Sequence, residues 1–300
     1  MQEIAWIEAK RILQRTRDER WFGTAYNMNL YRGCCHGCIY CDSRSACYGI
    51  TQFDRVQVKR DALNLLQREL SQKRRKGIVG TGAMSDPYNP LERELRYTRG
   101  ALELLCAHGF GVAIATKSDL IVRDIDVLQR MAQRAPVICK VTVTTCDDAL
   151  AQKLEPNVSR PSQRFAAIGQ LSDAGLFTGV LMMPILPFVE DNEANLMGIV
   201  SRAKQSGARF VYPALGVTLR DNQRQWFLQQ LERQFPGQGL AMKYRAQYAS
   251  AYQCVTPRVR TLWPKLTRAC RENGLYIRMG DIVRASKRPY EVEQLCMFDP

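Results

Sequence analysis

The chain has 300 residues, of which 46% are apolar and 24% are charged. These values are ordinary for a globular protein and exclude the disordered, collagen-like and low-complexity classes. The 43 Lys and Arg residues outnumber the 29 Asp and Glu residues, which gives a formal net charge of +14. A surplus of this size favours a polyanionic partner such as nucleic acid, with solubility alone as the alternative explanation.

Nothing in the sequence indicates a membrane segment or a secretion signal. The longest apolar stretch, residues 176–189, has 14 residues and contains two prolines. A transmembrane helix needs about 20 apolar residues. The first 11 residues mix acidic, basic and apolar side chains without the apolar core of a signal peptide. We therefore expect a soluble, cytoplasmic protein.

Short apolar segments alternate with amphipathic stretches along the first two thirds of the chain. The apolar segments are rich in β-branched residues and predict strands at residues 26–31, 77–82, 111–116, 137–145, 177–185 and 209–214. The amphipathic stretches predict helices at residues 61–72, 98–107, 123–134, 162–174 and 192–205. Glycines follow three of these helices, as C-cap glycines do: Gly109, Gly175 and Gly207. This alternation is typical of βαβ units in a parallel sheet.

The pattern changes at about residue 220. From there the sequence predicts helices with many glutamines, followed by a polar tail. We therefore predict a main domain over residues 1–219, including an N-terminal extension, and a smaller, mainly helical region over residues 220–300. In the main domain, residues 137–145 alternate between apolar and polar toward their end, which suits a strand with one face lining a cavity.

Residues that can bind a metal or a ligand follow several of the predicted strands. A cysteine cluster follows the first strand, small residues and a Ser-Asp pair follow the second, and Lys117 follows the third. The fourth strand ends in Thr144 and Thr145. Because ligands of parallel α/β folds gather at the carboxyl ends of the strands, we expect these groups to meet at one rim. With only two histidines in the chain, His36 and His108, histidine-dependent hydrolytic mechanisms are disfavoured.

The cysteines predict a metal site rather than a disulfide framework. The chain has 11 cysteines, an odd number, and four of them fall within eight residues: Cys34, Cys35, Cys38 and Cys41. Two spacings compete, C-x-x-C-x-x-C and C-x-x-x-C-x-x-C. A structural zinc site usually takes two pairs of ligands, and no second pair exists here, although Cys47 or His36 can complete a compact site. Three thiolates on an early loop fit an iron–sulfur cluster better, while zinc and incidental cysteines remain alternatives.

The sequence around the cluster resembles a known family. Residues 29–41, N-L-Y-R-G-C-C-H-G-C-I-Y-C, resemble the signature of radical S-adenosylmethionine (SAM) enzymes, and more narrowly of the spore photoproduct lyase-like branch. The resemblance covers roughly residues 9–213. Its other matching segments are G-A-M-S-D-P-Y-N-P-L-E at 82–92, T-K-S-D-L-I-V-R-D-I-D at 116–126, L-E-P at 154–156 and M-P-I-L-P at 183–187.

The resemblance implies a partial (β/α)6 barrel of the TIM type, a 4Fe–4S cluster and SAM. By the family pattern Cys34, Cys38 and Cys41 are the cluster ligands, whereas Cys35 is not. The fourth iron of such a cluster is chelated by SAM, whose reductive cleavage yields methionine and a 5′-deoxyadenosyl radical that abstracts hydrogen from a substrate. An electron donor such as flavodoxin or ferredoxin is implied as well.

Nucleic acid is the leading substrate, because the positive net charge and the resemblance to the spore photoproduct lyase-like branch both favour it. Repair of a damaged DNA base, a lyase-like reaction, is the sharpest version of this hypothesis. One alternative is a radical SAM enzyme that acts on tRNA, a peptide or a small metabolite. Another is a non-catalytic, zinc-stabilised nucleic-acid-binding protein.

The resemblance also assigns SAM-binding residues at the same rim. Tyr40 is expected against the adenine, Lys117 near the methionyl carboxylate and Thr144 near a ribose hydroxyl. The remaining assignments are Gly80, Thr81, Gly82, Ser85 and Asp86 near the methionyl amine, and Arg164 in an ion pair with Glu155. For each of these residues an ordinary packing, capping or surface role is the alternative.

The hydrogen donor of the family branch is missing. Spore photoproduct lyases carry a cysteine shortly before the Ser-Asp pair, where this chain reads G-A-M-S-D. Cys139 and Cys146 are candidate substitutes, with core packing as the alternative for both. No role is assigned to Cys35 or Cys47.

The end of the chain carries a separate motif. Residues 294–299, Q-L-C-M-F-D, resemble the Q-L-x-L-F peptide by which bacterial DNA enzymes dock on the sliding clamp. Gln294, Leu295, Met297 and Phe298 are the expected contacts, with Leu295 and Phe298 as the apolar anchors. The alternative is a tail that packs on its own barrel.

Overall fold

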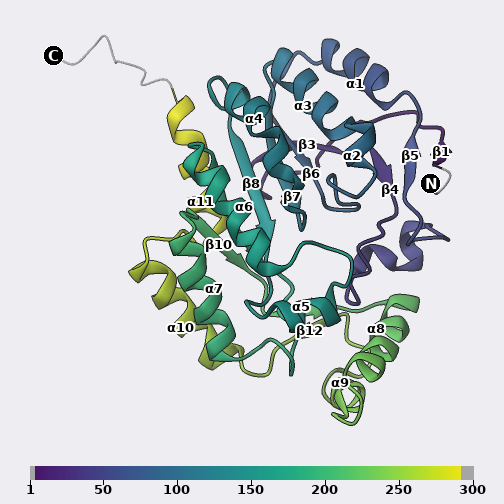
Figure 1. Ribbon diagram of the computed structural model, residues 1–300, viewed down its shortest axis with the longest axis vertical. Helices are drawn as coiled ribbons and strands as arrows, with labels where there is room; N and C mark the ends of the chain where they lie inside the picture. The colour runs from purple at the N-terminus through teal and green to yellow at the C-terminus, as the bar shows by residue number, and fades with distance from the viewer. Residues whose placement is uncertain (1–3, 292–300) are drawn as a thin grey trace.

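The computed structural model describes residues 4–291. Its central element is a seven-stranded sheet in the order β10-β9-β8-β7-β6-β3-β2 (Figure 1). The strands are β2 Leu13–Arg15, β3 Thr24–Met28, β6 Ile78–Thr81, β7 Gly111–Thr116, β8 Val137–Thr142, β9 Phe177–Met182 and β10 Phe210–Pro213. All neighbours from β3 to β10 pair in parallel, and β2 is antiparallel to β3. Six parallel strands match the six predicted ones, and the partial-barrel fold is confirmed.

Helices connect the parallel strands and cover the outer face of the sheet (Figure 1). They are α1 Ala62–Ser71, α2 Glu92–Leu95, α3 Tyr97–Ala107, α4 Ile125–Ala132, α5 Asp148–Leu154, α6 Pro161–Asp173 and α7 Glu193–Gln205. The three glycines predicted to end helices all have positive φ values, between 70° and 79°. The five predicted helices are therefore confirmed. The short helices α2 and α5 were not predicted.

The two faces of the sheet contribute to different cores. Along β8, Cys139 and Val141 pack into the large core between sheet and helices. Ile138 faces a smaller inner core with Phe22 and Phe210. Lys140, two residues after Ile138, is buried beside this inner core, with its Nζ atom 4.4 Å from the centre of the Phe22 ring. The strand alternation thus places a lysine inside the barrel, among apolar side chains.

Short strands flank the barrel at both ends of the chain. A three-stranded sheet comprises β1 Ala5–Ile7, β5 Gln57–Lys59 and β4 Tyr31–Arg32. An antiparallel pair comprises β11 Gly216–Thr218 and β12 Gln253–Val255. The C-terminal helices are α8 Asp221–Gln234, α9 Leu240–Tyr248, α10 Val259–Glu272 and α11 Met279–Lys287. Helices α8 and α9 lie side by side, and their apolar side chains share a hydrophobic core with Leu150 and Leu154 of α5 (Figure 1).

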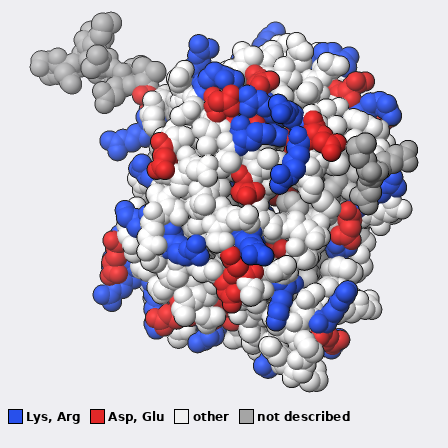
Figure 2. Space-filling view, viewed as in Figure 1, with Lys and Arg blue, Asp and Glu red and all other residues white. Residues whose placement is uncertain are grey.

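Figure 2 shows the charged side chains on one face of the molecule. In the face shown in Figure 2, Lys and Arg side chains are spread over the molecule and interleave with Asp and Glu. Within residues 4–291, no helix combines the length and the apolar character needed to cross a membrane.

Candidate functional site

The cysteine segment leaves β4 through a tight bend. Gly33 has a φ of 77°, and a Cβ atom there would lie 2.7 Å from the carbonyl oxygen of Phe53. Only glycine fits this position, because the left-handed backbone and the close contact both exclude a side chain. The next residue, Cys34, donates its backbone N–H to the same carbonyl at 2.8 Å. Further along, the Ile39 N–H donates to Leu154 O at 2.9 Å, which ties the segment to the end of α5.

Three thiols of this segment influence one another. Burial raises the pKa of Cys34 to about 12 and raises the pKa values of Cys38 and Cys41 as well. The charges of Cys34 and Cys41 raise the pKa of Cys38 further, whereas Lys117 lowers it. Burial and the charges of Asp86 and Asp54 raise the pKa of the partly buried Cys35 thiol as well. The expected cluster ligands Cys34, Cys38 and Cys41 thus lie in one buried segment whose thiols act on one another electrostatically, and their role as ligands stays a prediction.

This donor set fits an iron–sulfur cluster. Thiolates are the usual ligands of such clusters, and the Lys117 ammonium lies close enough to favour negative charge on two of them. Among residues 4–291, no three His, Cys, Asp or Glu side chains are grouped closely enough to hold a single metal ion. A four-iron cluster offers a separate iron to each thiolate, so its protein ligands do not have to meet at a single ion.

A cavity of about 540 Å³ lies beside the cysteine segment. Its lining includes Tyr40, Cys41, Ala83 and Lys117, together with the antiparallel pair β11–β12. The Lys117 Nζ atom is 5.7 Å from the centre of the Tyr40 ring. The volume is typical of a small-molecule site, and the lining combines apolar side chains with one cation and two aromatic side chains, Tyr40 and Trp263. We call it the thiol cavity.

A buried polar network lies next to the thiol cavity. The Tyr40 hydroxyl donates to the Glu155 carboxylate, and the Arg164 guanidinium forms an ion pair with Glu155 at 2.5 Å. Arg164 also donates to Thr142 O at 2.9 Å. Burial by itself opposes ionisation of Glu155, but Arg164 and Lys117 outweigh it and hold the pKa of Glu155 below its usual value. The Glu155–Arg164 pair is therefore internal and not a pair on a helix surface.

Ser85 and Asp86 contact the protein's own backbone. The Ser85 hydroxyl donates to Gly33 O at 2.6 Å, just before the first thiol. The Asp86 carboxylate accepts hydrogen bonds from the Thr116 hydroxyl at 2.7 Å and from the Lys117 N–H at 2.8 Å. Both side chains thus fix the parts of the chain that carry the thiols and Lys117. Their expected contact with SAM stays a prediction.

The other predicted residues lie at the same strand ends. Gly82 ends the β6 segment with a φ of 94°, where a Cβ atom would lie 1.9 Å from Ala115 O. Gly80 and Thr81 belong to β6, and Thr81 is buried. Thr144 is buried, and its carbonyl accepts a hydrogen bond from the Asn195 side chain at 2.8 Å. None of these four residues lines the thiol cavity as Tyr40 and Lys117 do.

The hydrogen-donor candidates lie away from the thiol cavity. Cys139 is fully buried in the core between sheet and helices. Cys146 lies beside α7, with its sulfur 3.6 Å from the position that a Cβ atom of Gly198 would take. Neither lines the cavity, whereas Cys254 of β12 does. The expected clamp-docking residues Gln294, Leu295, Met297 and Phe298 lie outside the described residues.

Sequence reasoning missed two parts of the site. Glu190 is buried, accepts the Leu186 N–H at 3.0 Å, and raises the pKa of the neighbouring Tyr40. Burial raises the pKa of Glu190 itself to about 8, and its Oε1 atom has no partner among the described residues. The one available signal was its position after the fifth parallel strand, at the rim where the other groups gather.

The second missed part is the start of α8, residues 220–223, which we call the α8 clamp. Its side chains bind residues 40–46, which surround and follow the cysteine Cys41. Arg220 pairs with Asp42 at 2.5 Å, and the Gln223 amide donates to the carbonyl of Tyr40 at 3.1 Å. Asp221 and Asn222 accept hydrogen bonds from Ser45 and from the Ala46 N–H, both at 2.7 Å. No local pattern indicates contacts across more than 170 residues.

Comparison with known proteins identifies the class. The model of the Radical SAM superfamily matches residues 28–198. An uncharacterized protein of Mycobacterium tuberculosis strain H37Rv is 32% identical over 230 residues, which cover 74% of this chain and 67% of the relative. An uncharacterized protein of Methanocaldococcus jannaschii is 28% identical over 194 residues, which cover 64% of this chain and 71% of the relative. The chain belongs to the radical SAM superfamily.

Solved structures agree with this assignment at the level of the fold. Spore photoproduct lyase complexed with dinucleoside spore photoproduct superposes with a TM-score of 0.66 at 14% sequence identity, covering 91% of this chain and 81% of that chain. A cysteine-to-serine mutant of the same lyase gives a TM-score of 0.68, also at 14% identity with the same coverage. The protein is thus a radical SAM enzyme that uses a 4Fe–4S cluster and SAM, as predicted. This assignment favours the enzyme over a zinc-stabilised binding protein.

Proposed function

We propose that the enzyme abstracts hydrogen from nucleic acid, with a damaged base in DNA as the leading substrate. The observation that carries the proposal is a ligand-sized cavity beside three grouped thiols, in a chain with a net charge of +14. The similarity in fold to a lyase complexed with a dinucleoside lesion supports the same substrate class. A radical SAM enzyme acting on tRNA, a peptide or a small metabolite is the alternative.

In this proposal Cys34, Cys38 and Cys41 hold the cluster, which supplies the electron that cleaves SAM. Lys117 offsets negative charge at the mouth of the thiol cavity, and Tyr40 offers a ring to the adenine. The other proposed SAM-binding residues are Gly80, Thr81, Gly82, Ser85, Asp86, Thr144 and Arg164. Of these, Ser85 and Asp86 hold neighbouring backbone in place, and Arg164 keeps Glu155 ionised beside Tyr40.

The cluster assignment is tested with two adjacent cysteines. Cys34→Ala and Cys35→Ala are prepared anaerobically beside the wild type and reconstituted with iron and sulfide. We expect Cys34→Ala to lose bound iron and 5′-deoxyadenosine formation, while Cys35→Ala keeps both. Equal loss in the two variants would contradict the assignment, and zinc in place of iron and sulfide would contradict the cluster itself.

The substrate is tested by binding and turnover. We expect lesion-bearing oligonucleotides to bind with an affinity that falls as salt rises, because phosphate contacts release counterions. They should also be consumed together with SAM, unlike undamaged strands. Formation of 5′-deoxyadenosine without any salt-dependent binding of DNA would favour a peptide or metabolite, and binding of tRNA alone would favour the tRNA alternative.

The other expected features are proposals as well. We propose an electron donor of the flavodoxin or ferredoxin kind, and a division of the chain into residues 1–219 and 220–300. A hydrogen-donor role for Cys139 or Cys146 gains no support from their placement away from the thiol cavity. Clamp docking is tested with a fluorescent peptide of residues 288–300, and an absence of binding to a bacterial sliding clamp would reject it.

A further inference from the structure

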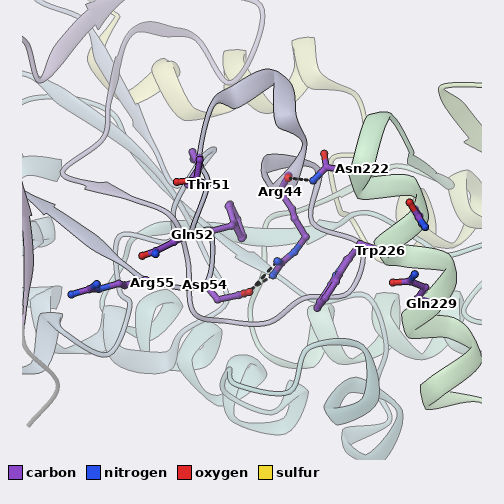
Figure 3. A pocket seen from close by; sticks show the side chains of 11 residues that line it. Arg44, Thr51, Gln52, Asp54, Arg55, Asn222, Trp226 and Gln229 are labelled. Carbon is purple, nitrogen blue, oxygen red and sulfur yellow. Dashed lines mark hydrogen bonds and ion pairs between the residues drawn. The ribbon is translucent and has the colours of Figure 1, made fainter.

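A second cavity, of about 590 Å³, is lined by Arg44, which lies three residues after the cysteine Cys41. Asp42 and Ser43 line the thiol cavity, whereas the next residue, Arg44, lines the second one. Its walls are residues 50–55 and helix α8, which face each other across the opening (Figure 3). Residues 42–44 thus pass from the lining of one cavity to the lining of the other.

Amide side chains dominate the polar wall of this cavity. Gln52, Gln225 and Gln229 line it, and their side chains form no hydrogen bond with other residues of the described part of the chain. Gln229 is on the α8 wall and Gln52 on the opposite one (Figure 3). An amide presents a donor and an acceptor side by side, as the edge of a nucleobase does. The wall thus suits a planar, uncharged ligand with paired donors and acceptors.

Planar groups lie on both walls, with Trp226 on α8 and Phe53 in residues 50–55. The Arg44 guanidinium lies 4.2 Å from the centre of the Trp226 ring and 4.9 Å from that of Phe53, and it bonds to Asp54 at 3.0 Å (Figure 3). The side chain of Arg44 is only 11% exposed, so this stack is rigid. Arg44 Nε and Trp226 Nε1 are buried donors without a partner among residues 4–291.

The charges of the cavity exclude a simple anion site. Asp54 balances Arg44, which leaves Arg55 as the one lining cation without an ion pair among the described residues. One exposed arginine does not gather a free phosphate against water, but it can contact the phosphate attached to a bound base. We propose that this cavity binds a single unstacked nucleobase of a nucleic-acid strand that also reaches the thiol cavity. The inference rests on the proposed nucleic-acid substrate and adds a second contact point to it.

The test compares strands with and without a base. The reconstituted holoenzyme is titrated with fluorescein-labelled single strands, in DNA and RNA versions, that carry either normal bases or consecutive abasic sites. Gln225→Ala/Gln229→Ala removes two amides from the exposed side of α8, and Gln238→Ala is the matched control outside the cavity. We expect the double variant to bind base-containing strands roughly tenfold more weakly, since a bidentate contact to a base contributes about 1–3 kcal/mol. Its affinity for abasic strands and its 5′-deoxyadenosine formation should be unchanged.

Each other outcome is decisive. Equal wild-type affinity for abasic and normal strands would show that only the backbone is bound and would overturn the inference. An unchanged affinity of the double variant, in an enzyme that does bind nucleic acid, would overturn it while leaving the proposed function intact. If the holoenzyme binds no strand at any salt concentration, the nucleic-acid substrate and this site both fail. A tenfold loss confined to DNA or to RNA identifies which strand the site recognises.

Discussion

Two lysines on neighbouring strands show how the barrel treats buried charge. Lys117 follows β7 at the mouth; burial opposes its charge, but Cys38 and Glu155 outweigh this effect and raise its pKa. Lys140, in the middle of β8, is buried beside Phe22 and forms no ion pair with a carboxylate among residues 4–291, so burial lowers its pKa to about 7. Charged side chains at the carboxyl ends of the barrel strands are therefore stabilised by pairing, whereas burial without a partner in the barrel interior favours the neutral form.

The largest effect is expected where a buried pair is broken. Arg164→Ala leaves the Glu155 carboxylate buried without its partner, which typically costs about 3–5 kcal/mol. We expect the free energy of unfolding, measured by urea titration under anaerobic conditions, to fall by that order. The control is Glu155→Gln/Arg164→Met, which removes both charges and should lose less. A single variant as stable as the wild type would mean that pairing does not stabilise the mouth.

The next effect concerns the unpaired lysine. The native pKa of Lys140, about 7, lies below the value of about 10.4 expected for the unfolded chain. The unfolded state therefore binds more protons between these values, and wild-type stability gains from this group as pH rises through that window. We expect Lys140→Met to be more stable than the wild type at pH 7, by roughly 2–4 kcal/mol, and to lose this advantage toward pH 10. A difference that does not change with pH would contradict a neutral Lys140.

Glu190 should show the opposite pH dependence. Its native pKa of about 8 lies above the ordinary carboxyl value, so the native state holds the proton more tightly. The contribution of Glu190 to stability is complete at low pH and is lost as pH rises toward 8. The charged groups near it, Glu155 and Asp191, act in the same direction. We expect Glu190→Gln to match the wild type near pH 5 and to be about 2 kcal/mol more stable at pH 9, as measured by urea unfolding.

The smallest effect is expected at the exposed rim. Arg220 and Asp42 are each about 30% exposed, at 30% and 29%, so solvent screens their attraction. Arg220→Ala should lower the unfolding free energy by about 0.2–1 kcal/mol. Arg284→Ala, which breaks the more exposed pair with Asp281, is the control and should change stability even less. A loss of unfolding free energy as large as that of Arg164→Ala would contradict the expectation that solvent screens the Arg220–Asp42 pair.

The sequence predicted those features that repeat locally. The six parallel strands and five of the helices follow from periodicity, and the spacing of the thiols from a segment of 13 residues. Strands of two or three residues, such as β4 and β11, carry no period and were missed. Side-chain contacts were harder to predict: the Ser85 hydroxyl donates to Gly33 O, and its expected contact with SAM stays a prediction. The α8 clamp and Glu190 depend on contacts between distant segments, which no single-sequence pattern reports.

The α8 clamp also sets an order of events during synthesis. The three thiols leave the ribosome first, and Arg220 follows its partner Asp42 only 178 residues later. At about 5–20 residues per second, that gap lasts roughly 10–35 seconds. During this interval the cysteine segment can already bond to Phe53 O and Leu154 O, but it lacks the contacts of the α8 clamp. We therefore expect a truncated chain that ends before residue 220 to take up the cluster less completely than the full chain.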